Sequence, residues 1–339
     1  MTHNYDAVLI VSFGGPERPE DVMPFLENVL RGKNVPRERM LEVAQHYDRF
    51  GGVSPINQQN RELIAALEKE LAEKGPQLPV YWGNRNWHPL LPDTIGQMHS
   101  QGVRRAVALV SSAYSSYSSC RQYLEDIQRA RVAAGAETLQ VDKLRVFFNH
   151  PGFVEPMVEG VRSALNEIPT GRLTTTQIIY TAHSIPEAMA RGCQYAAQLM
   201  ETCHCVSKSV SELSWKLVFQ SRSGPPSQPW LGPDICDYLR ELHGTQRVTD
   251  VVVVPIGFVS DHLEILFDLD TEAREVCEEL GLNMVRAKTV GTDPKFISMI
   301  RELILERTDD DGARRSVGAL GPSHDLCPEN CCPSGRPTA

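Results

Sequence analysis

The chain has 339 residues, 41% of them hydrophobic and 23% charged, a composition typical of a globular protein large enough for two domains. Its formal net charge of −9 argues against a general nucleic-acid or anionic-membrane binder. No apolar stretch approaches the roughly 18 residues that a membrane-spanning helix needs. The apolar start at Ala7–Phe13 follows no Lys or Arg, so we interpret it as a buried strand rather than a signal peptide. Nine cysteines without an export signal then predict thiols or metal ligands and a cytoplasmic protein.

Strand and helix patterns alternate along the chain. The strands expected in the first half are Ala7–Phe13, Val80–Gly83, Ala106–Val110 and Leu144–Phe148. Helices are expected there at Asp21–Arg31, Arg37–Tyr47, Asn57–Lys74, Thr94–Gln101 and Arg121–Ala134. The strands of the second half are expected near Ile178–Thr181, Lys216–Phe219, Val251–Val254 and Asn283–Ala287. Its helices are expected near Phe153–Glu167, Glu187–Thr202, Leu263–Leu280 and Pro294–Glu306.

This alternation predicts an α/β protein with two similar doubly wound, Rossmann-like domains, each built on a parallel sheet. We expect the domains at residues 1–150 and 151–307, with a ligand cleft between them. Residues 308–339 form a Cys-containing tail that needs a tie of some kind to stay ordered.

The segment that follows Val251–Val254 carries a row of acids. Four consecutive valines are typical of a parallel strand buried on both faces. Asp261 can cap the next helix, on which Glu264, Asp268 and Glu272 follow at four-residue spacing. Open α/β sheets bind ligands at the carboxyl ends of their strands, so a ligand site is indicated here. The alternative is an ordinary solvated helix face.

His183 lies at the end of another expected strand. Ser184 and Glu187 form a capping-box pattern, which predicts that a helix begins directly after the histidine. The imidazole would then lie at a strand end beside the positive end of a helix dipole. Together with Glu264 it offers a base and an anionic partner for a cation. The alternative is a structural histidine.

Three further segments have both a structural and a ligand-binding interpretation. A basic run could contact an anionic ligand or be a solvated helix junction, and it consists of Arg31, Lys33, Arg37 and Arg39. Ser54 follows two glycines and could be either a turn residue or a polar contact. The serine-rich segment Ser111–Tyr123 could form a polar wall of the expected cleft. Gly14 and Gly15 lack the full dinucleotide fingerprint, which favours a tight turn there.

Five motifs in this order resemble the ferrochelatase family over about residues 5–307. They are Ser12–Pro16, Gly51–Asn57, Thr181–Pro186, Gln220–Pro225 and Pro255–Glu264. The family inserts Fe²⁺ into a porphyrin held in a cleft between two similar α/β domains. The resemblance therefore implies a metal chelatase of haem biosynthesis, with Fe²⁺ and a porphyrin as substrates.

The resemblance also assigns residues. It makes His183 and Glu264 the catalytic pair at the metal, and Asp268 and Glu272 a polar path for the incoming ion. The porphyrin-contacting positions are Ser54, Tyr123 and Phe13, with Arg31 near the propionates. Phe13 departs from members with tyrosine at that position, which puts an axial oxygen ligand from it in doubt.

The basic, polar segment Gly32–Met40 stands where membrane-bound relatives carry an apolar lip. It favours the tetracarboxylate coproporphyrin III over protoporphyrin IX, which stays the alternative substrate. A non-catalytic tetrapyrrole or metal carrier and a cobalt or nickel chelatase are the rival functions. We expect a monomer without an integral membrane segment or a nucleic-acid partner.

The tail gathers Cys327, Cys331 and Cys332 in six residues. Some ferrochelatases hold a [2Fe–2S] cluster on one internal and three C-terminal cysteines, and Cys120 matches the internal position. The rival fourth ligands are Cys193, Cys203 and Cys205. The adjacent pair Cys331–Cys332 is a difficulty, because both thiolates must turn toward one centre. Cys236 and Cys277 are expected to be core or helix residues.

Overall fold

The computed structural model describes residues 4–32, 35–210, 212–224, 227–245, 248–308 and 313–335. The chain forms two compact units. Unit 1 comprises Met1–Ser111, Gln122–Leu144 and Ile300–Ala313. Unit 2 comprises Ser112–Arg121, Arg145–Met299 and Arg314–Ala339. Each contains a four-stranded parallel sheet within its described residues, so the predicted two-domain α/β class is confirmed.

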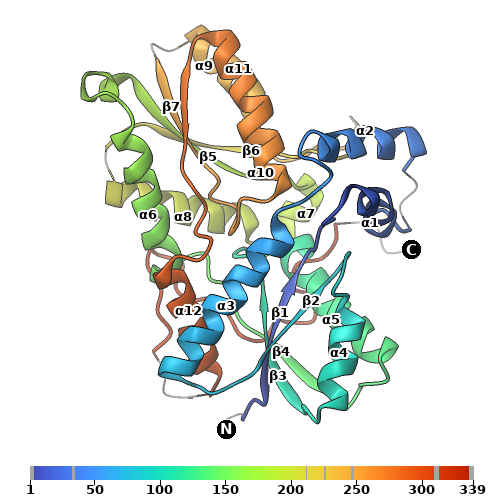
Figure 1. Cartoon of the computed structure of the whole chain (residues 1–339). Helices are drawn as coiled ribbons and strands as arrows, with labels where there is room; N and C mark the ends of the chain where they lie inside the picture. The colour runs from blue at the N-terminus through green and yellow to red at the C-terminus, as the bar shows by residue number, and fades with distance from the viewer. Residues whose placement is uncertain are drawn as a thin grey trace. The chain divides into compact units, whose positions relative to one another are not determined.

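The sheet of unit 1 has the strand order β2-β1-β3-β4 (Figure 1). Its strands are β1 (Ala7–Ser12), β2 (Val80–Asn84), β3 (Arg105–Val110) and β4 (Gln140–Lys143). Its helices are α1 (Val22–Val29), α2 (Arg37–Asp48), α3 (Ile56–Lys74), α4 (Leu91–Ser100), α5 (Gln122–Ala133) and the part of α12 (Pro294–Thr308) after Met299. Apolar side chains of β1 and β3 form one buried cluster with α4 and α5. Arg301 of α12 donates to the carbonyl oxygens of Lys74 and Gly75, which joins α12 to the end of α3.

The sheet of unit 2 has the matching order β6-β5-β7-β8. Its strands are β5 (Thr176–His183), β6 (Trp215–Gln220), β7 (Asp250–Val254) and β8 (Asn283–Arg286). Its helices are α6 (Pro151–Asn166), α7 (Glu187–Arg191), α8 (Tyr195–Val210), α9 (Ile235–Thr245), α10 (Leu263–Phe267) and α11 (Arg274–Leu280), with π-helical segments η2 (Tyr117–Arg121) and η4 (Asp268–Ala273). All four valines of β7 are fully buried, which confirms the strand expected from their pattern. Helices α9, α10 and α11 share one apolar core with the sheet.

Two expectations about the elements were wrong, and one helix was missed. Leu144–Phe148 is buried but is not a strand, and the more polar Gln140–Lys143 pairs with β3 instead. The helix expected at Glu187–Thr202 is broken into α7 and α8. The break lies at Gly192, where an added Cβ would come 2.7 Å from Pro333 Cγ. Helix α9 was not expected.

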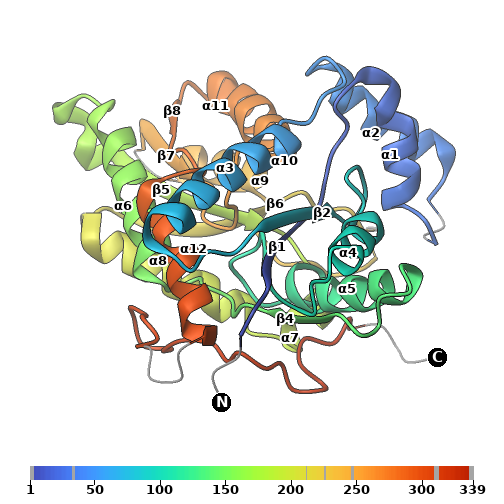
Figure 2. The same cartoon turned by 60° about the horizontal axis from the view of Figure 1, so that its bottom comes forward.

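The tail is part of unit 2 and packs against the rest of that unit. Figure 2 shows it, in red, passing beside α7 and α8. The backbone amide of Leu320 donates to Glu201 Oε1 at 2.8 Å, and Asn149 donates to the carbonyl oxygen of Gly321 at 2.7 Å. Protein contacts therefore help to hold the tail in place. Among the described helices, none is long and apolar enough to cross a membrane.

Candidate active site

The first cluster of polar side chains in unit 2 lies where β5 and β7 end. Gly257 follows β7 and donates its backbone N–H to the carbonyl oxygen of Thr181 in β5 at 3.0 Å. An added Cβ at Gly257 would lie 2.6 Å from Ala182 Cβ and 2.7 Å from Ala182 Cα. Only glycine therefore allows this close approach, which brings the segment before α10 next to the end of β5.

His183 is the last residue of β5. Its Nδ1 lies 2.5 Å from the carbonyl oxygen of Ser184. Because a carbonyl only accepts hydrogen bonds, Nδ1 carries the proton and Nε2 keeps its lone pair in the neutral ring. Nε2 lies 3.9 Å from Glu264 Oε2, and the two side chains are 38% and 44% exposed. A basic nitrogen and a carboxylate thus stand side by side within reach of solvent.

His262 is a third member of this group, and we did not predict it. Its Nε2 lies 4.0 Å from Glu264 Oε2, and its ring packs edge-on against Phe258. Burial lowers the pKa of His262, so this ring is neutral near pH 7. The signal in the sequence is its spacing, two residues before Glu264 in the motif that carries the resemblance.

Asp268 opens the π-helical segment that follows α10. It accepts hydrogen bonds from Ser221 Oγ and from Gln220 Nε2, the latter at 3.1 Å. Burial, and next the charge of Glu264, raise the pKa of Asp268 to about 7, although the hydrogen bond from Ser221 opposes the shift. Glu272 is exposed, four residues further along, and its charge also raises this pKa. Glu264 and Glu272 are therefore electrostatic neighbours of Asp268. Glu264 lies in α10, whereas Asp268 and Glu272 lie on a π-helical segment instead of the regular helix expected.

Both predicted helix caps were wrong. Helix α7 begins at Glu187 without a side-chain cap, and Ser184 Oγ donates instead to the carbonyl oxygen of Leu231 at 2.7 Å. Asp261 pairs with Arg286 at 2.9 Å, and α10 begins one residue after His262. The serine and the aspartate therefore fix the loops around the site rather than the helix ends.

Unit 1 holds the residues predicted to contact porphyrin. Phe13 follows β1 and packs edge-on against Phe25 with ring centroids 6.2 Å apart. Ser54 is buried, and its backbone amide donates to the carbonyl oxygen of Pro16 at 2.8 Å. Two of the predicted motifs thus pack against each other after β1.

Arg31 and Tyr123 have different surroundings. Arg31 is exposed and donates to Asn28 Oδ1 at 2.5 Å. Tyr123 is buried under the Arg85 guanidinium, whose central carbon lies 3.7 Å from the ring centroid. Lys33 lies outside the described residues, and so does Pro225 of one motif. The serine-rich segment is attached to α8, because the backbone amide of Ser115 donates to Gln198 Oε1 at 2.8 Å.

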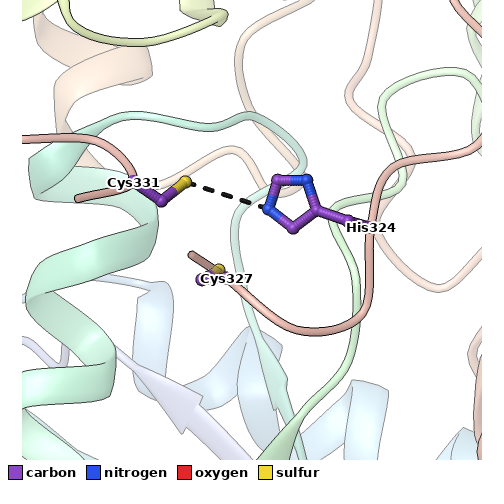
Figure 3. A group of neighbouring side chains, drawn as sticks. All are labelled: His324, Cys327 and Cys331. Carbon is purple, nitrogen blue, oxygen red and sulfur yellow. Dashed lines mark hydrogen bonds between the residues drawn. The ribbon is translucent and has the colours of Figure 1, made fainter. Parts of the chain in front are cut away.

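The tail thiols form a second polar cluster in unit 2. Cys331 Sγ lies 3.4 Å from Cys332 Sγ and 3.8 Å from His324 Nε2, a contact shown in Figure 3. Cys332 has a φ of +54°, a left-handed backbone conformation that is uncommon for a residue other than glycine. Burial, then Cys331, and after it Cys120 and Cys193, raise the pKa of Cys332. All nine cysteines are thiols, and Cys203 is fully buried in α8.

Comparison with known proteins decides the family. The ferrochelatase sequence model matches residues 5–308. A Rhodopirellula baltica protein named ferrochelatase is 53% identical over 328 residues, which cover 97% of this chain and 93% of the relative. The chain belongs to the ferrochelatase family. A Streptomyces griseus protein named coproporphyrin III ferrochelatase is 50% identical, with 98% of this chain and 94% of the relative covered.

Solved structures support the fold of this ferrochelatase. SirB from Bacillus subtilis with Fe³⁺ is similar with a TM-score of 0.54 and 11% identity, over 91% of this chain and 98% of that one. A sirohydrochlorin chelatase SirB in complex with cobalt gives a TM-score of 0.50 at 11% identity, with the same coverage. The prediction of a ferrochelatase, a metal-chelating enzyme, is confirmed by the family.

Proposed function

We propose that this ferrochelatase inserts Fe²⁺ into coproporphyrin III, with His183 and Glu264 as the catalytic pair. The observation that carries the proposal is the 3.9 Å separation of His183 Nε2 and Glu264 Oε2 at an accessible strand end. The choice of porphyrin is supported by the names of relatives about 50% identical to this chain. It is also supported by the exposed arginines at positions 31, 37 and 39, which suit a tetracarboxylate.

Metal insertion requires the porphyrin to lose two pyrrole protons while Fe²⁺ loses its water ligands. His183 Nε2 holds a lone pair and is the proposed acceptor for a pyrrole proton. Glu264 would stabilise the resulting imidazolium and offer an anionic ligand to the ion. The net reaction converts porphyrin and Fe²⁺ to metalloporphyrin and two protons, so charge and atoms balance.

Asp268 and Glu272 are the proposed approach path for Fe²⁺. A carboxyl whose pKa is about 7 changes between neutral and anionic forms near physiological pH. Asp268 can therefore hold a cation loosely and release it toward Glu264. The charge of Glu264 raises the pKa of Asp268 more than the charge of Glu272 does. In unit 1, we propose Phe13, Ser54 and Tyr123 as porphyrin-facing positions.

We further propose that the tail holds a [2Fe–2S] cluster on Cys327, Cys331, Cys332 and one more donor. The resemblance assigns that donor to Cys120, with Cys193, Cys203 and Cys205 as the alternatives. The expected difficulty with adjacent thiols has a physical answer, because the left-handed backbone of Cys332 leaves the two Sγ atoms 3.4 Å apart. A bound cluster would supply iron–thiolate bonds that crosslink the tail. Nine thiols also suit a reducing compartment, so we propose a cytoplasmic location.

The test is anaerobic Fe²⁺ insertion, followed by absorbance, with coproporphyrin III and protoporphyrin IX offered side by side. We expect a higher kcat/KM with coproporphyrin III. A preference for protoporphyrin IX would overturn the substrate assignment. Binding of both porphyrins without metallation would favour the carrier over the enzyme.

A further inference from the structure

Two buried tyrosines of unit 2 donate hydrogen bonds to the backbone where β5 and β7 end. Tyr195 Oη donates to the carbonyl oxygen of His183 at 2.9 Å. Tyr114 Oη donates to the carbonyl oxygen of Ile256 at 2.8 Å. Tyr114 is 1% exposed and Tyr195 is 4% exposed, so water does not compete for either bond. We propose that this tyrosine pair positions His183 relative to Glu264 for metal insertion.

The first hydrogen bond fixes the peptide group that joins His183 to Ser184. Its oxygen accepts from Tyr195, and its N–H donates to the carbonyl oxygen of Gln220 in β6 at 2.8 Å. Because a peptide group is planar, partners on both edges fix its orientation. The next carbonyl oxygen, that of Ser184, accepts the hydrogen bond from His183 Nδ1. Tyr195 therefore helps to hold both the backbone and the ring of the histidine.

The second hydrogen bond fixes the peptide group that joins Ile256 to Gly257. Its oxygen accepts from Tyr114, and its N–H donates to the carbonyl oxygen of Thr181 in β5 at 3.0 Å. This peptide group is therefore also held at both edges. It begins the segment that leads to α10, where Glu264 lies. Each member of the tyrosine pair thus holds the backbone that carries one member of the catalytic pair.

The two rings also contact each other. The Tyr114 and Tyr195 centroids are 6.1 Å apart and the ring planes are at 82°, an edge-on geometry that aromatic pairs favour. Burial raises the pKa of both hydroxyls, and the neighbouring Cys193 and then Glu264 add to the shift at Tyr195. Both hydroxyls therefore stay protonated and can donate. Since the rings are packed together, the two strand ends keep a fixed separation.

A third buried tyrosine separates positioning from a purely structural role. Tyr180 is fully buried in β5, and its Oη lies 2.8 Å from Ser207 Oγ in α8. Its hydroxyl contacts a side chain rather than the backbone at a strand end. Tyr180→Phe is therefore the matched control, because it also removes one buried, hydrogen-bonded hydroxyl from the same unit.

The inference rests on the proposed catalytic roles of His183 and Glu264. The test compares Tyr195→Phe, Tyr114→Phe and the control by kcat for Fe²⁺ insertion, porphyrin Kd from fluorescence titration, and the urea midpoint. A backbone shift of about 0.5 Å should lower kcat by about tenfold, since about 1 Å can cost about 10²-fold. We expect this loss in the first two variants with porphyrin Kd within about twofold of wild type. The control should keep wild-type kcat.

A spectroscopic measurement follows the histidine directly. In protein labelled with ¹⁵N-histidine, Tyr195→Phe should shift the imidazole resonances of His183, which His183→Ala assigns, and Tyr180→Phe should leave them in place. Wild-type kcat in a folded Tyr195→Phe or Tyr114→Phe would overturn the inference, and either variant tests it if the other fails to fold. An equal loss of kcat in the control would overturn it too. Wild-type turnover in His183→Ala would instead overturn the proposed catalytic role.

Discussion

The placement of His183 beside Glu264, the proposed catalytic pair, depends on the contact between Gly257 and Ala182, and Gly257→Ala tests this dependence. The new Cβ would lie 2.6 Å from Ala182 Cβ and 2.7 Å from its Cα. Ordinary carbon contacts are about 3.5–4.0 Å, so the two segments must move apart by about 1 Å. Overpacking of this kind costs about 1–3 kcal/mol of unfolding free energy. A misplacement of about 1 Å can lower turnover by about 10²-fold.

The assay combines urea unfolding with kcat for Fe²⁺ insertion. Gly244→Ala is the control, because no atom lies within 4 Å of its added Cβ, and the position lies in α9. The control should keep wild-type kcat and stability, or gain about 0.5–1 kcal/mol as helical Gly→Ala changes do. Folded Gly257→Ala with kcat within about twofold of wild type would refute the proposed dependence of the catalytic geometry on this contact.

Three further predictions follow from the site. His183→Ala and Glu264→Gln should each lower kcat by about 10²–10⁴-fold, the usual contribution of a general acid or base. The porphyrin Kd, measured by fluorescence titration, should be nearly unchanged. A variant that keeps wild-type turnover would show that the residue it replaces has no part in the mechanism. Because the carboxyl of Asp268 has a pKa of about 7, the KM for Fe²⁺ should fall as pH rises through 7, and Asp268→Asn should flatten this step. Between about pH 4 and 7, Asp268 keeps its proton in the folded state and loses it in the unfolded state. The free energy of unfolding, measured by urea titration, should therefore fall as pH rises through this window in the wild type, and fall less in Asp268→Asn. Replacing exposed Arg31 and Arg37 with Ala should raise the KM for coproporphyrin III by about two- to fivefold at low salt, since exposed ion pairs are worth about 0.2–1 kcal/mol. An equal rise in the KM for protoporphyrin IX would contradict a role of these arginines in carboxylate recognition.

Burial was easier to predict from the sequence than strand pairing. The apolar run Leu144–Phe148 is buried as expected. Its aromatic rings pack against other rings, with Phe147 and Phe153 centroids 5.6 Å apart, and the segment forms no strand. The adjacent strand Gln140–Lys143 has little apolar character, because it lies at the edge of the sheet and pairs only with β3. An apolar run predicts that a segment is buried. It does not predict whether the segment is buried by pairing in a sheet or by packing against other side chains.

The position of one proposed site residue was predictable from the sequence because that residue ends a strand. His183 was expected at the end of a strand, and β5 ends there. The separation of His183 and Glu264 depends on the long-range contact of Gly257 with β5, which local patterns do not contain. His324 went unnoticed for a similar reason. Its spacing from Cys327 is visible, but its approach to Cys331 depends on how the tail folds on unit 2.

The alternation of the chain between the two units constrains how the protein forms during synthesis. Unit 1 takes its last segment from Ile300–Ala313, after almost all of unit 2. That segment supplies Leu303 and Ile304, both fully buried. The amino-terminal unit therefore cannot complete its core while the ribosome is still making the second sheet, although domains usually fold in order of their emergence. The nascent chain therefore keeps an unfinished apolar surface on its first sheet until α12 has left the ribosome.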